Sequence, residues 1–408
     1  MYTLGIYIYI ALVKIAALFG HKKAKQMLQG HKETFAKLKE GLSSENTYIW
    51  FHVSSLGEFE QGRPLMERIR AKHPEYRIVL TFFSPSGYRS AKQYPYADVV
   101  CYLPFDTKLN ARRFVNMVNP KMAFFVKYEY WLNFLYTLKR KNIPTYSVSS
   151  IFRKEQVFFR AWGGMYRRVL SCFTHLFVQN EESRQLLSGI GVKCVSVVGD
   201  TRFDRVIQIC EAAKQLPLVE AFVEGERPVF VVGSSWGADE AVYMPYFNTK
   251  PAWKLIIASH EVNEARLKHI ESVYNGVCVR YTQATMDEVR AADCLLIDCF
   301  GLLSSIYRYG DIAYVGGGFG VGIHNILEAA VYGMPVFFGP NNAKFQEATR
   351  LKECGGGIEI HGTDDFTKKM QLFDEDKSAL KLAGDAAGGY VSGNSGASDK
   401  ILEALGLN

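Results

Sequence analysis

From residue 48 onward, the chain repeats one pattern: a short β-branched or aromatic run, a Gly, Ser or Pro turn, and a helical stretch. The runs are apolar on both alternating faces, as expected of strands buried between two layers of helices. Strands that alternate with helices predict parallel sheets. The predicted strands are 48–53, 77–83, 99–103, 121–127, 145–150, 175–179 and 194–199 in the first half, and 228–233, 254–259, 277–281, 294–298, 312–317, 335–339 and 357–360 in the second.

Seven predicted strands in each half indicate an α/β protein with two Rossmann-like, doubly wound domains. Ligands of such sheets bind beyond the carboxyl ends of the strands, so we expect the domains to face a cleft that suits a group transfer. An acidic, Pro-containing stretch at 211–228 marks the boundary. The predicted parts are an N-terminal helix with a basic linker (1–45), a first domain (46–215), a second domain (225–390) and a C-terminal helix (391–408).

Residues 2–20 are apolar except for Lys14. As a helix, this stretch would be about 28 Å long, close to the roughly 30 Å hydrocarbon core of a bilayer. Six lysines and two glutamates follow within the next twenty residues. Positive charge on that side predicts a single N-terminal membrane anchor with the rest of the chain in the cytoplasm. A helix lying in the membrane interface and an ordinary docked helix are the alternatives.

The composition limits the classes of partner that we expect the chain to bind. A formal net charge of +7 fits an anionic partner such as nucleic acid, phospholipid or a phosphorylated substrate. The lysines are spread and no nucleic-acid-binding motif occurs, so we do not expect nucleic-acid binding. The eight cysteines form no Cys-x-x-Cys pair and show no zinc spacing, so we expect reduced thiols and no structural metal.

Two loops of the first half place a carboxylate just after a predicted strand. In HVSSLGEFEQGRP, residues 52–64, Ser55 and Glu58 fit a capping box, in which Glu58 only returns a hydrogen bond to the helix start. At the carboxyl edge of a strand, the same side chain could instead serve as a general base. KYEYWLN, residues 127–133, places Glu129 at another such edge.

Several other loops suit a nucleotide. VVGSSWGADE predicts a turn after Gly233 and then a helix, whose N-terminal amides and serine hydroxyls could hold a phosphate. A glycine loop precedes a helix predicted from about His324 to Gly333, and its spacing disfavours a nicotinamide enzyme. An arginine in GDTRFDR could clamp a phosphate. The predicted nucleotide ligands are Arg202, Ser234, Ser235, His260, Gly317, Gly318, Asn325 and Glu328.

Taken together, these loops resemble the 3-deoxy-D-manno-octulosonic acid (Kdo) transferases of lipopolysaccharide synthesis, which belong to the GT-B glycosyltransferase superfamily. FHVSSLGEFEQG resembles the H-x-x-S-x-GE block of the family, whose glutamate is the catalytic base, here Glu58. KYEYWLN resembles the ETE-x-WPN block and keeps Glu129, Trp131 and Asn133, with Lys127 in place of the first glutamate. The resemblance thus implies catalytic roles for Glu58 and Glu129.

Two further blocks extend the resemblance. GDTRFD resembles G-N-x-KFD, with Arg202 for the lysine. The glycine loop through HNILEAA resembles the donor-nucleotide signature, which places Asn325 and Glu328 on CMP and its ribose.

The resemblance implies a GT-B fold and an inverting transfer of Kdo from CMP-Kdo to a lipid A precursor at the cytoplasmic face of the inner membrane. It implies no metal and no other cofactor. The expected partners are CMP-Kdo, the lipid A precursor and inner-membrane lipid. The main alternative is another GT-B glycosyltransferase that uses a UDP-sugar. A nucleotide-sugar epimerase would need no membrane anchor, and an exported substrate-binding protein would lack the cytoplasmic charge bias.

Overall fold

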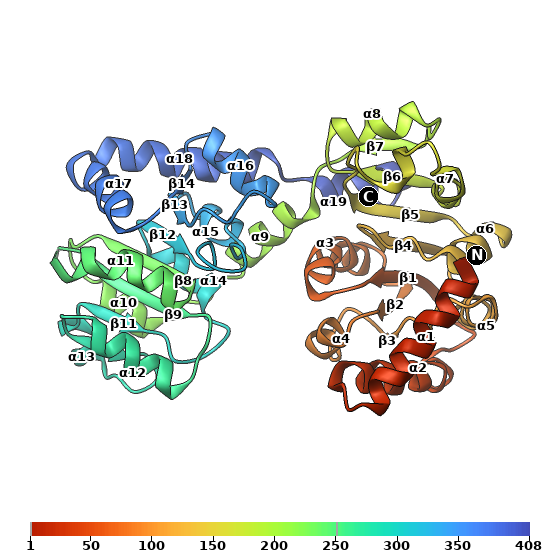
Figure 1. Cartoon of the computed structure of the whole chain (residues 1–408), viewed down its shortest axis with the longest axis horizontal. Helices are drawn as coiled ribbons and strands as arrows, with labels where there is room; N and C mark the ends of the chain where they lie inside the picture. Colours follow the sequence, from red (N-terminus) through yellow and green to blue (C-terminus); the bar gives the residue numbers. More distant parts are fainter. Residues whose placement is uncertain (1, 250–251) are drawn as a thin grey trace. The chain divides into compact units, whose positions relative to one another are not determined.

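A computed structural model describes residues 2–249 and 252–408 of the chain. It divides into two compact units: unit 1 is Met1–Arg205 with Ser395–Asn408, and unit 2 is Val206–Asn394. Each unit contains a seven-stranded parallel sheet with helices around it (Figure 1). The prediction of an α/β protein with two doubly wound sheets is confirmed. The division at Arg205 comes earlier in the chain than the predicted boundary at 211–228.

The sheet of unit 1 has the strand order β3-β2-β1-β4-β5-β6-β7. Its strands are β1 (Thr47–Val53), β2 (Tyr76–Phe82), β3 (Val99–Tyr102), β4 (Met122–Val126), β5 (Thr145–Ser150), β6 (His175–Val178) and β7 (Val195–Val197). Its helices are α1 (Tyr2–Leu18), α2 (Lys22–Gly41), α3 (Leu56–Lys72), α4 (Pro85–Ala91), α5 (Lys108–Val118), α6 (Leu132–Arg140), α7 (Gly164–Leu170), α8 (Glu181–Gly189) and α19 (Ala397–Leu405), while α9 (Thr201–Glu211) crosses into unit 2 and Val157–Phe159 form a short 3-10 turn.

The sheet of unit 2 has the order β10-β11-β9-β8-β12-β13-β14. Its strands are β8 (Val229–Ser235), β9 (Lys254–Ser259), β10 (Cys278–Arg280), β11 (Cys294–Leu296), β12 (Ile312–Val315), β13 (Val336–Phe338) and β14 (Gly357–Glu359). Its helices are α10 (Pro217–Val223), α11 (Gly237–Thr249), α12 (Glu264–Val273), α13 (Met286–Ala291), α14 (Leu303–Ile306), α15 (Leu327–Ala330), α16 (Gln346–Glu353), α17 (Thr363–Glu375) and α18 (Lys377–Gly393), and Tyr307–Tyr309 form a second 3-10 turn.

Strand β1 shows why the predicted runs were apolar throughout. Trp50 packs into one core cluster with Phe114 of α5, whereas Ile49 and Phe51 pack into the cluster on the opposite face with Leu65 of α3. Because both faces of the sheet are covered, the apolar pattern is continuous rather than alternating.

The end of the chain belongs to unit 1. Ile401 and Leu402 of α19 lie in the same core cluster as Ile49. The Asp204 carboxylate accepts hydrogen bonds from the backbone N–H groups of Gly396 and Ser398, at 2.6 and 2.7 Å. The final helix is therefore fastened to the first sheet by both apolar packing and a buried carboxylate.

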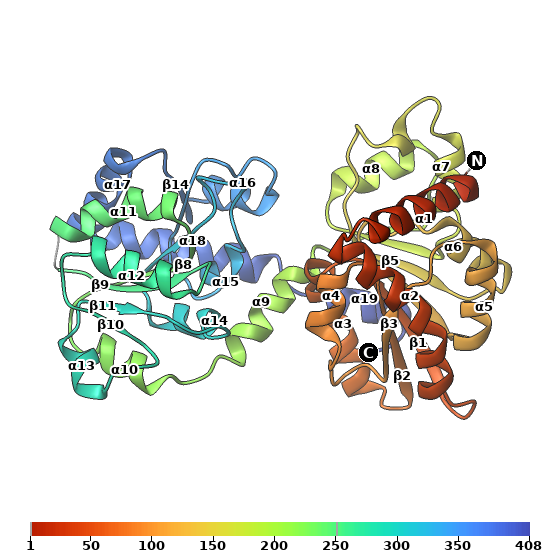
Figure 2. The same ribbon diagram turned by 60° about the horizontal axis from the view of Figure 1, so that its bottom comes forward.

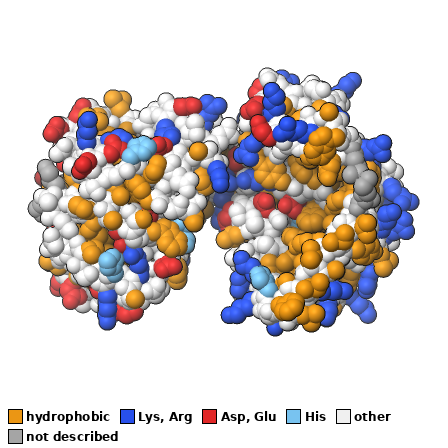
Figure 3. Space-filling model, in the orientation of Figure 1, with side chains coloured by type: hydrophobic (Ala, Val, Ile, Leu, Met, Phe, Trp, Pro, Cys, Tyr) orange, Lys and Arg blue, Asp and Glu red, His pale blue; other side chains and the backbone are white. Residues whose placement is uncertain are grey.

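Helix α1 lies across one side of unit 1 (Figure 2). The Tyr2 hydroxyl donates to Asp106 Oδ2 at 2.7 Å, and Val13 and Ala17 pack against Phe105. Several large apolar side chains of this segment stay exposed, with Lys and Arg side chains around them (Figure 3). They are Leu4, Tyr7, Ile8, Tyr9, Leu12, Ile15, Leu18 and Phe19. Across residues 2–249 and 252–408, no helix combines the length and apolar character needed to cross a bilayer, so the N-terminal anchor stays a prediction.

Candidate functional site

Unit 1 brings two carboxylates to one edge of its sheet. Strands β1 and β4 are parallel neighbours, so the loops that follow them lie side by side. Glu58 is the third residue of α3, directly after β1, and Glu129 follows β4 by three residues. Glu129 is 8% exposed and Glu58 is half-buried. The structure thus places both predicted catalytic residues at the carboxyl ends of adjacent strands.

Glu58 forms the predicted capping box. Its Oε2 atom accepts hydrogen bonds from the backbone N–H groups of Ser54 and Ser55, both at 2.8 Å, and from the Ser55 hydroxyl at 3.1 Å. Within the described residues, every hydrogen bond of Glu58 goes to this one oxygen. The capping box therefore orients the carboxylate and leaves Oε1 without a protein partner, as a proton-accepting group requires.

The pKa of Glu58 is raised above its ordinary value. Burial is the largest cause and the negative charge of Glu129 is the next, while the hydrogen bonds from Ser55 and Ser54 lower the pKa in part. A raised pKa makes Glu58 a stronger base than an exposed glutamate. The loops that carry the two carboxylates follow neighbouring strands, so the charge of Glu129 acts on Glu58.

A buried histidine holds Glu129. His52 of β1 is fully buried, and its Nε2 atom lies 3.0 Å from Glu129 Oε2. Its Nδ1 atom lies 2.9 Å from Thr81 Oγ1 and 3.2 Å from the Thr81 carbonyl oxygen. The Trp131 indole N–H donates to Glu129 Oε2 at 2.6 Å. His52 was not among the predicted site residues, although its place near the end of β1, next to the start of the Glu58 loop, was a signal for this contact.

The loop after β4 is fixed at both ends. Lys127 has a φ of +61°, a left-handed conformation that is uncommon for a residue with a side chain, and it turns the chain towards Glu129. Asp106 accepts hydrogen bonds from the backbone N–H groups of Asn133 and Phe134, at 3.1 and 3.0 Å, and so caps α6. Burial raises the pKa of Asp106 to about 6, against the hydrogen bonds it accepts. Asn133 therefore joins the start of α6 to Asp106.

Arg202 lies in the first turn of α9, in unit 1, whereas the other predicted nucleotide ligands lie in unit 2. Its backbone N–H donates to Asp200 Oδ1 at 2.9 Å. Arg205 forms an ion pair with Glu60, with Nε and Oε2 2.6 Å apart. Glu60 also forms an ion pair with Arg63.

In unit 2, the loop after β8 differs from the prediction. Strand β8 continues through Ser235, which pairs with Ser259 of β9, and α11 begins only at Gly237. Ser235 is 1% exposed and its hydroxyl donates to Glu240 Oε1 at 3.0 Å, so this hydroxyl is already committed within the protein. Ser234 is half-buried with a φ of +54°. The predicted turn directly after Gly233 is therefore wrong.

Three rings stack at the carboxyl ends of β8, β9 and β12. The His260 ring stacks on Trp236 with centroids 4.3 Å apart and on His324 at 4.6 Å. The Trp236 indole N–H donates to His324 Nε2 at 3.3 Å. Burial, and then the proximity of His260, lower the pKa of His324. His260 is exposed, so the stack offers a flat face to a ligand.

The glycine loop is held by one buried carboxylate. Asp239 is fully buried. Its Oδ2 atom accepts hydrogen bonds from the backbone N–H groups of Trp236 and Gly317, both at 2.9 Å, and its Oδ1 accepts from the Tyr314 hydroxyl at 2.7 Å. Asp239 thus joins the loop after β8 to the loop after β12, and a single sequence gives no signal for this pairing. A Cβ at Gly318 would lie 2.5 Å from the backbone nitrogen of Gly339.

The helix predicted to start near His324 is much shorter than expected. It begins at Leu327, because the Asn325 side-chain oxygen accepts a hydrogen bond from the Leu327 N–H at 3.3 Å. The Asn325 amide also donates to Glu328 Oε1 at 2.8 Å. Gly317 and Gly318 are buried, and Asn325 and Glu328 are half-buried. The structure therefore brings Asn325 and Glu328 together directly after the glycine loop.

The described residues include no group of three or more His, Cys, Asp or Glu side chains arranged to hold a metal ion.

The two units offer different chemical groups. Unit 1 offers a candidate general base, Glu58, with a raised pKa, and a second carboxylate on the loop after the neighbouring strand. Unit 2 offers a stack of rings, a glycine loop and an amide–carboxylate pair. These groups suit a nucleobase, a phosphate and a ribose, respectively.

Comparison with known families gives a consistent picture. A family model described as 3-deoxy-D-manno-octulosonic-acid transferase (kdotransferase) matches residues 29–205. A 3-deoxy-D-manno-octulosonic acid transferase of Aquifex aeolicus is 26% identical over 352 residues, which is 84% of this chain and 91% of that protein. One of Haemophilus influenzae is 23% identical over 371 residues, with 88% and 86% covered. These matches confirm the resemblance that the loop motifs predicted.

Solved structures show the same fold. UDP-GlcNAc 2-epimerase of Neisseria meningitidis has a TM-score of 0.64 at 16% identity, with 89% of this chain and 100% of that chain covered. MurG of Acinetobacter baumannii has a TM-score of 0.57 at 8% identity, with 88% and 99% covered. At such identities the likeness concerns the fold alone, which is GT-B-like.

Proposed function

Because this chain is a glycosyltransferase related to the Kdo transferases, we propose that it transfers Kdo from CMP-Kdo to a lipid A precursor with inversion at the anomeric carbon. The main support for the proposal is the environment of the Glu58 carboxylate. It is held by its own capping box and has a raised pKa, and one of its oxygens accepts no hydrogen bond from the residues that the structure describes.

In the proposed reaction, the acceptor hydroxyl oxygen attacks the anomeric carbon of Kdo while Glu58 Oε1 takes the hydroxyl proton. The bond from the anomeric carbon to the phosphate oxygen breaks and CMP leaves. A single displacement of this kind inverts the configuration. General-base help is typically worth about 10²–10⁴-fold in rate. Glu129, held by His52 and Trp131, raises the basicity of Glu58 and supports positive charge that develops at the sugar ring.

The donor is proposed to bind to unit 2. The cytosine stacks on the exposed face of His260, the phosphate lies at the glycine loop, and the ribose lies beside Asn325 and Glu328. Arg202 remains a predicted phosphate ligand. We further propose that the transfer needs no metal ion, because cationic and backbone N–H groups can meet the charge of the departing CMP. Retention of activity in excess EDTA would support this point, and its loss would contradict it.

The proposed location is the cytoplasmic face of the inner membrane. Support comes from the exposed apolar side chains of α1 and the lysines of α2, which suit an anionic lipid surface. Each basic residue near such a surface contributes about 1 kcal/mol. Replacing Leu12 and Ile15 with glutamate should release the protein from membranes, and carbonate extraction would separate a spanning segment from one lying on the surface.

The decisive experiment incubates the purified chain with CMP-Kdo and a lipid A precursor and detects the product by mass. A thermal-shift series with CMP, UDP and NAD separates the main alternative, since a ligand stabilises the state to which it binds. CMP should raise the melting temperature most. A larger shift with UDP would favour a UDP-sugar glycosyltransferase instead.

A further inference from the structure

Unit 1 contains two adjoining cavities that the proposed reaction does not yet use. They share Tyr2 and Leu132 in their linings. The apolar cavity has a volume of about 380 Å³ and is lined by Tyr2, Tyr128, Tyr130, Leu132, Gln156, Val157, Phe158, Tyr166 and Val169. The basic cavity has a volume of about 440 Å³ and is lined by Tyr2, Thr3, Lys108, Arg112, Leu132, Asn133, Tyr136, Thr137 and Arg140.

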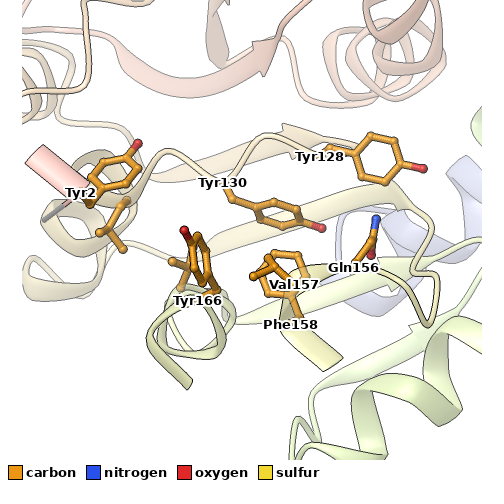
Figure 4. A pocket seen from close by; sticks show the side chains of 9 residues that line it. Tyr2, Tyr128, Tyr130, Gln156, Val157, Phe158 and Tyr166 are labelled. Atoms are coloured by element: carbon orange, nitrogen blue, oxygen red, sulfur yellow. The ribbon is translucent and has the colours of Figure 1, made fainter. Parts of the chain in front are cut away.

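The apolar cavity is shaped by rings and aliphatic side chains. Tyr2 lies at one end, Tyr128 and Gln156 lie at the other, and Tyr130 with Val157 lies between them (Figure 4). Among the described residues, no Asp, Glu, Lys or Arg side chain lines it. Such a space suits a hydrocarbon chain, since burial of each methylene is worth about fourfold in affinity, or about 0.8 kcal/mol.

The apolar cavity adjoins the loop that carries Glu129. Tyr128 and Tyr130 flank Glu129 in the chain. Leu132, which lines both cavities, follows Glu129 by three residues. An acyl chain is attached to its sugar at one end only. A sugar whose acyl chain fills the apolar cavity and whose phosphate lies in the basic cavity is therefore placed where the two cavities meet, close to this loop.

The basic cavity carries three cations. Lys108 and Arg112 are four residues apart on α5 and so share a face, and Arg140 is the last residue of α6. All three are exposed, and in the described part of the chain none of them forms an ion pair with a carboxylate. Clustered cations without acidic partners fit a phosphate group.

We propose that the two cavities bind one anionic lipid, with an acyl chain in the apolar cavity and a phosphate group at Lys108, Arg112 and Arg140. We further propose that this lipid is the acceptor itself, so the inference rests on the proposed function. Charge complementarity and the position beside Glu129 favour the acceptor over bulk membrane lipid. The two cavities then determine which acylated and phosphorylated sugars the enzyme accepts.

Direct binding tests the cavities without any transfer reaction. In calorimetric titrations of the full chain below the micelle concentration, decyl phosphate should bind more tightly than either decyl maltoside or inorganic phosphate. Equal affinities for decyl phosphate and inorganic phosphate would overturn the role of the apolar cavity. Equal affinities for decyl phosphate and decyl maltoside would overturn the role of the basic cavity.

Variants assign the binding to these residues. Val157→Trp fills the apolar cavity and should weaken decyl phosphate binding about tenfold, which corresponds to about 1.4 kcal/mol. Val157→Phe serves if the larger side chain prevents folding. Arg112→Ala and Arg140→Ala should each weaken binding roughly fivefold, as expected for a cation beside an anionic group. Lys193→Ala, an exposed lysine elsewhere on unit 1, is the matched control and should change nothing. Unchanged binding in the cavity variants would overturn the proposal.

Transfer assays and vesicles separate the remaining possibilities. The same variants should raise KM for the lipid A precursor and leave KM for CMP-Kdo unchanged. If they bind decyl phosphate less well but the wild type transfers no Kdo, the proposed function fails while the cavities stand. If transfer proceeds and acceptor KM is unchanged, the acceptor assignment fails. If Val157→Trp instead weakens binding to phosphatidylcholine–phosphatidylglycerol vesicles with acceptor KM unchanged, the occupant is membrane lipid and the proposal is wrong.

Discussion

Glu129 Oε2 lies 3.0 Å from Nε2 of the fully buried His52. The imidazole is itself oriented by Thr81 on the neighbouring strand, so β2 fixes a ring of β1 that fixes a carboxylate after β4. Glu58 is held independently by the amides at the start of α3. Two carboxylates are thus held by separate loops at one edge of the same sheet. Burial, and then the charge of Glu129, raise the pKa of Glu58.

Glu58→Gln should abolish most of the transfer activity with little change in folding. Glutamine can still accept the capping hydrogen bonds, because a capping box takes either residue. The lost function is proton acceptance, so kcat should fall by about 10²–10⁴-fold. The measurement is steady-state kinetics with CMP-Kdo and a lipid A precursor, with circular dichroism as the folding check.

The chain offers a matched control for this variant. Glu288 closes the same kind of capping box with Thr285 at the start of α13, with its Oε2 atom 2.8 Å from the Thr285 nitrogen. Glu288→Gln should leave the kinetics unchanged. Near-normal turnover in well-folded Glu58→Gln would remove Glu58 from the proposed mechanism.

Glu129→Gln should move the acidic limb of the kcat/KM profile to lower pH. The base must be ionised to accept a proton, so this limb follows the pKa of Glu58. Removing the negative charge of Glu129 removes one cause that raises that pKa. Residual rates measured from pH 4 to 8 would show the shift, and a limb that stays in place or moves upward would contradict it.

Glu58→Gln should also change the dependence of stability on pH. The pKa of Glu58 is higher in the folded state than in the unfolded state. Its ionised form therefore destabilises the folded state above the folded-state pKa, and this destabilisation is absent below the ordinary glutamate pKa, where Glu58 is protonated in both states. The contribution of Glu58 to wild-type stability therefore falls as pH rises through the window between the two values. The variant should melt at a higher temperature than wild type near pH 7.5, and the difference should shrink as pH falls below about 4.

For Glu288→Gln we expect a shift in melting temperature of the opposite sign. The hydrogen bonds from Thr285 lower the pKa of Glu288, so its charge favours folding above the ordinary value and that benefit is lost as pH falls. This variant should melt slightly below wild type at neutral pH. Melting shifts of the same sign in both variants would contradict the assignment of their pKa directions.

Asp239→Asn should weaken CMP binding indirectly, through the glycine loop that Asp239 holds. An asparagine amide group would face at least one of the donors that Asp239 now satisfies, namely the N–H groups of Trp236 and Gly317 and the Tyr314 hydroxyl. A buried donor left without its partner costs about 1–3 kcal/mol, and the glycine loop should loosen. Thermal melting should show the lower stability, and titration with CMP should show weaker binding. Unchanged CMP affinity would mean that the glycine loop does not depend on this carboxylate.

The strands could be predicted because each run is buried on both faces, as Ile49 and Trp50 illustrate from opposite faces of one strand. The exact turns could not. Ser235 remains in β8 because it pairs with Ser259, and the Asn325 side chain delays the start of α15. Both effects come from hydrogen bonds that local propensity does not encode.

In the candidate site, too, some residues could be predicted from the sequence and others could not. Glu58 and Glu129 could be found because each follows a strand, and the strand order then made them neighbours. The contacts of His52 and Asp239 join residues far apart in the sequence, 77 residues in the case of His52 and Glu129. Their partners are decided by sheet order and loop packing, which a single sequence does not state.

Two glycines of one loop give the sharpest test of the donor site. A Cβ at Gly318 would lie 2.5 Å from the Gly339 nitrogen, so alanine there must displace backbone, whereas at Gly320 the nearest atom is 3.7 Å away. Gly318→Ala should therefore shift the loop and weaken CMP binding by roughly tenfold, or about 1.4 kcal/mol. Gly320→Ala should bind CMP as the wild type does. Equal CMP affinity in both variants, measured by calorimetry on folded protein, would place the phosphate away from this loop.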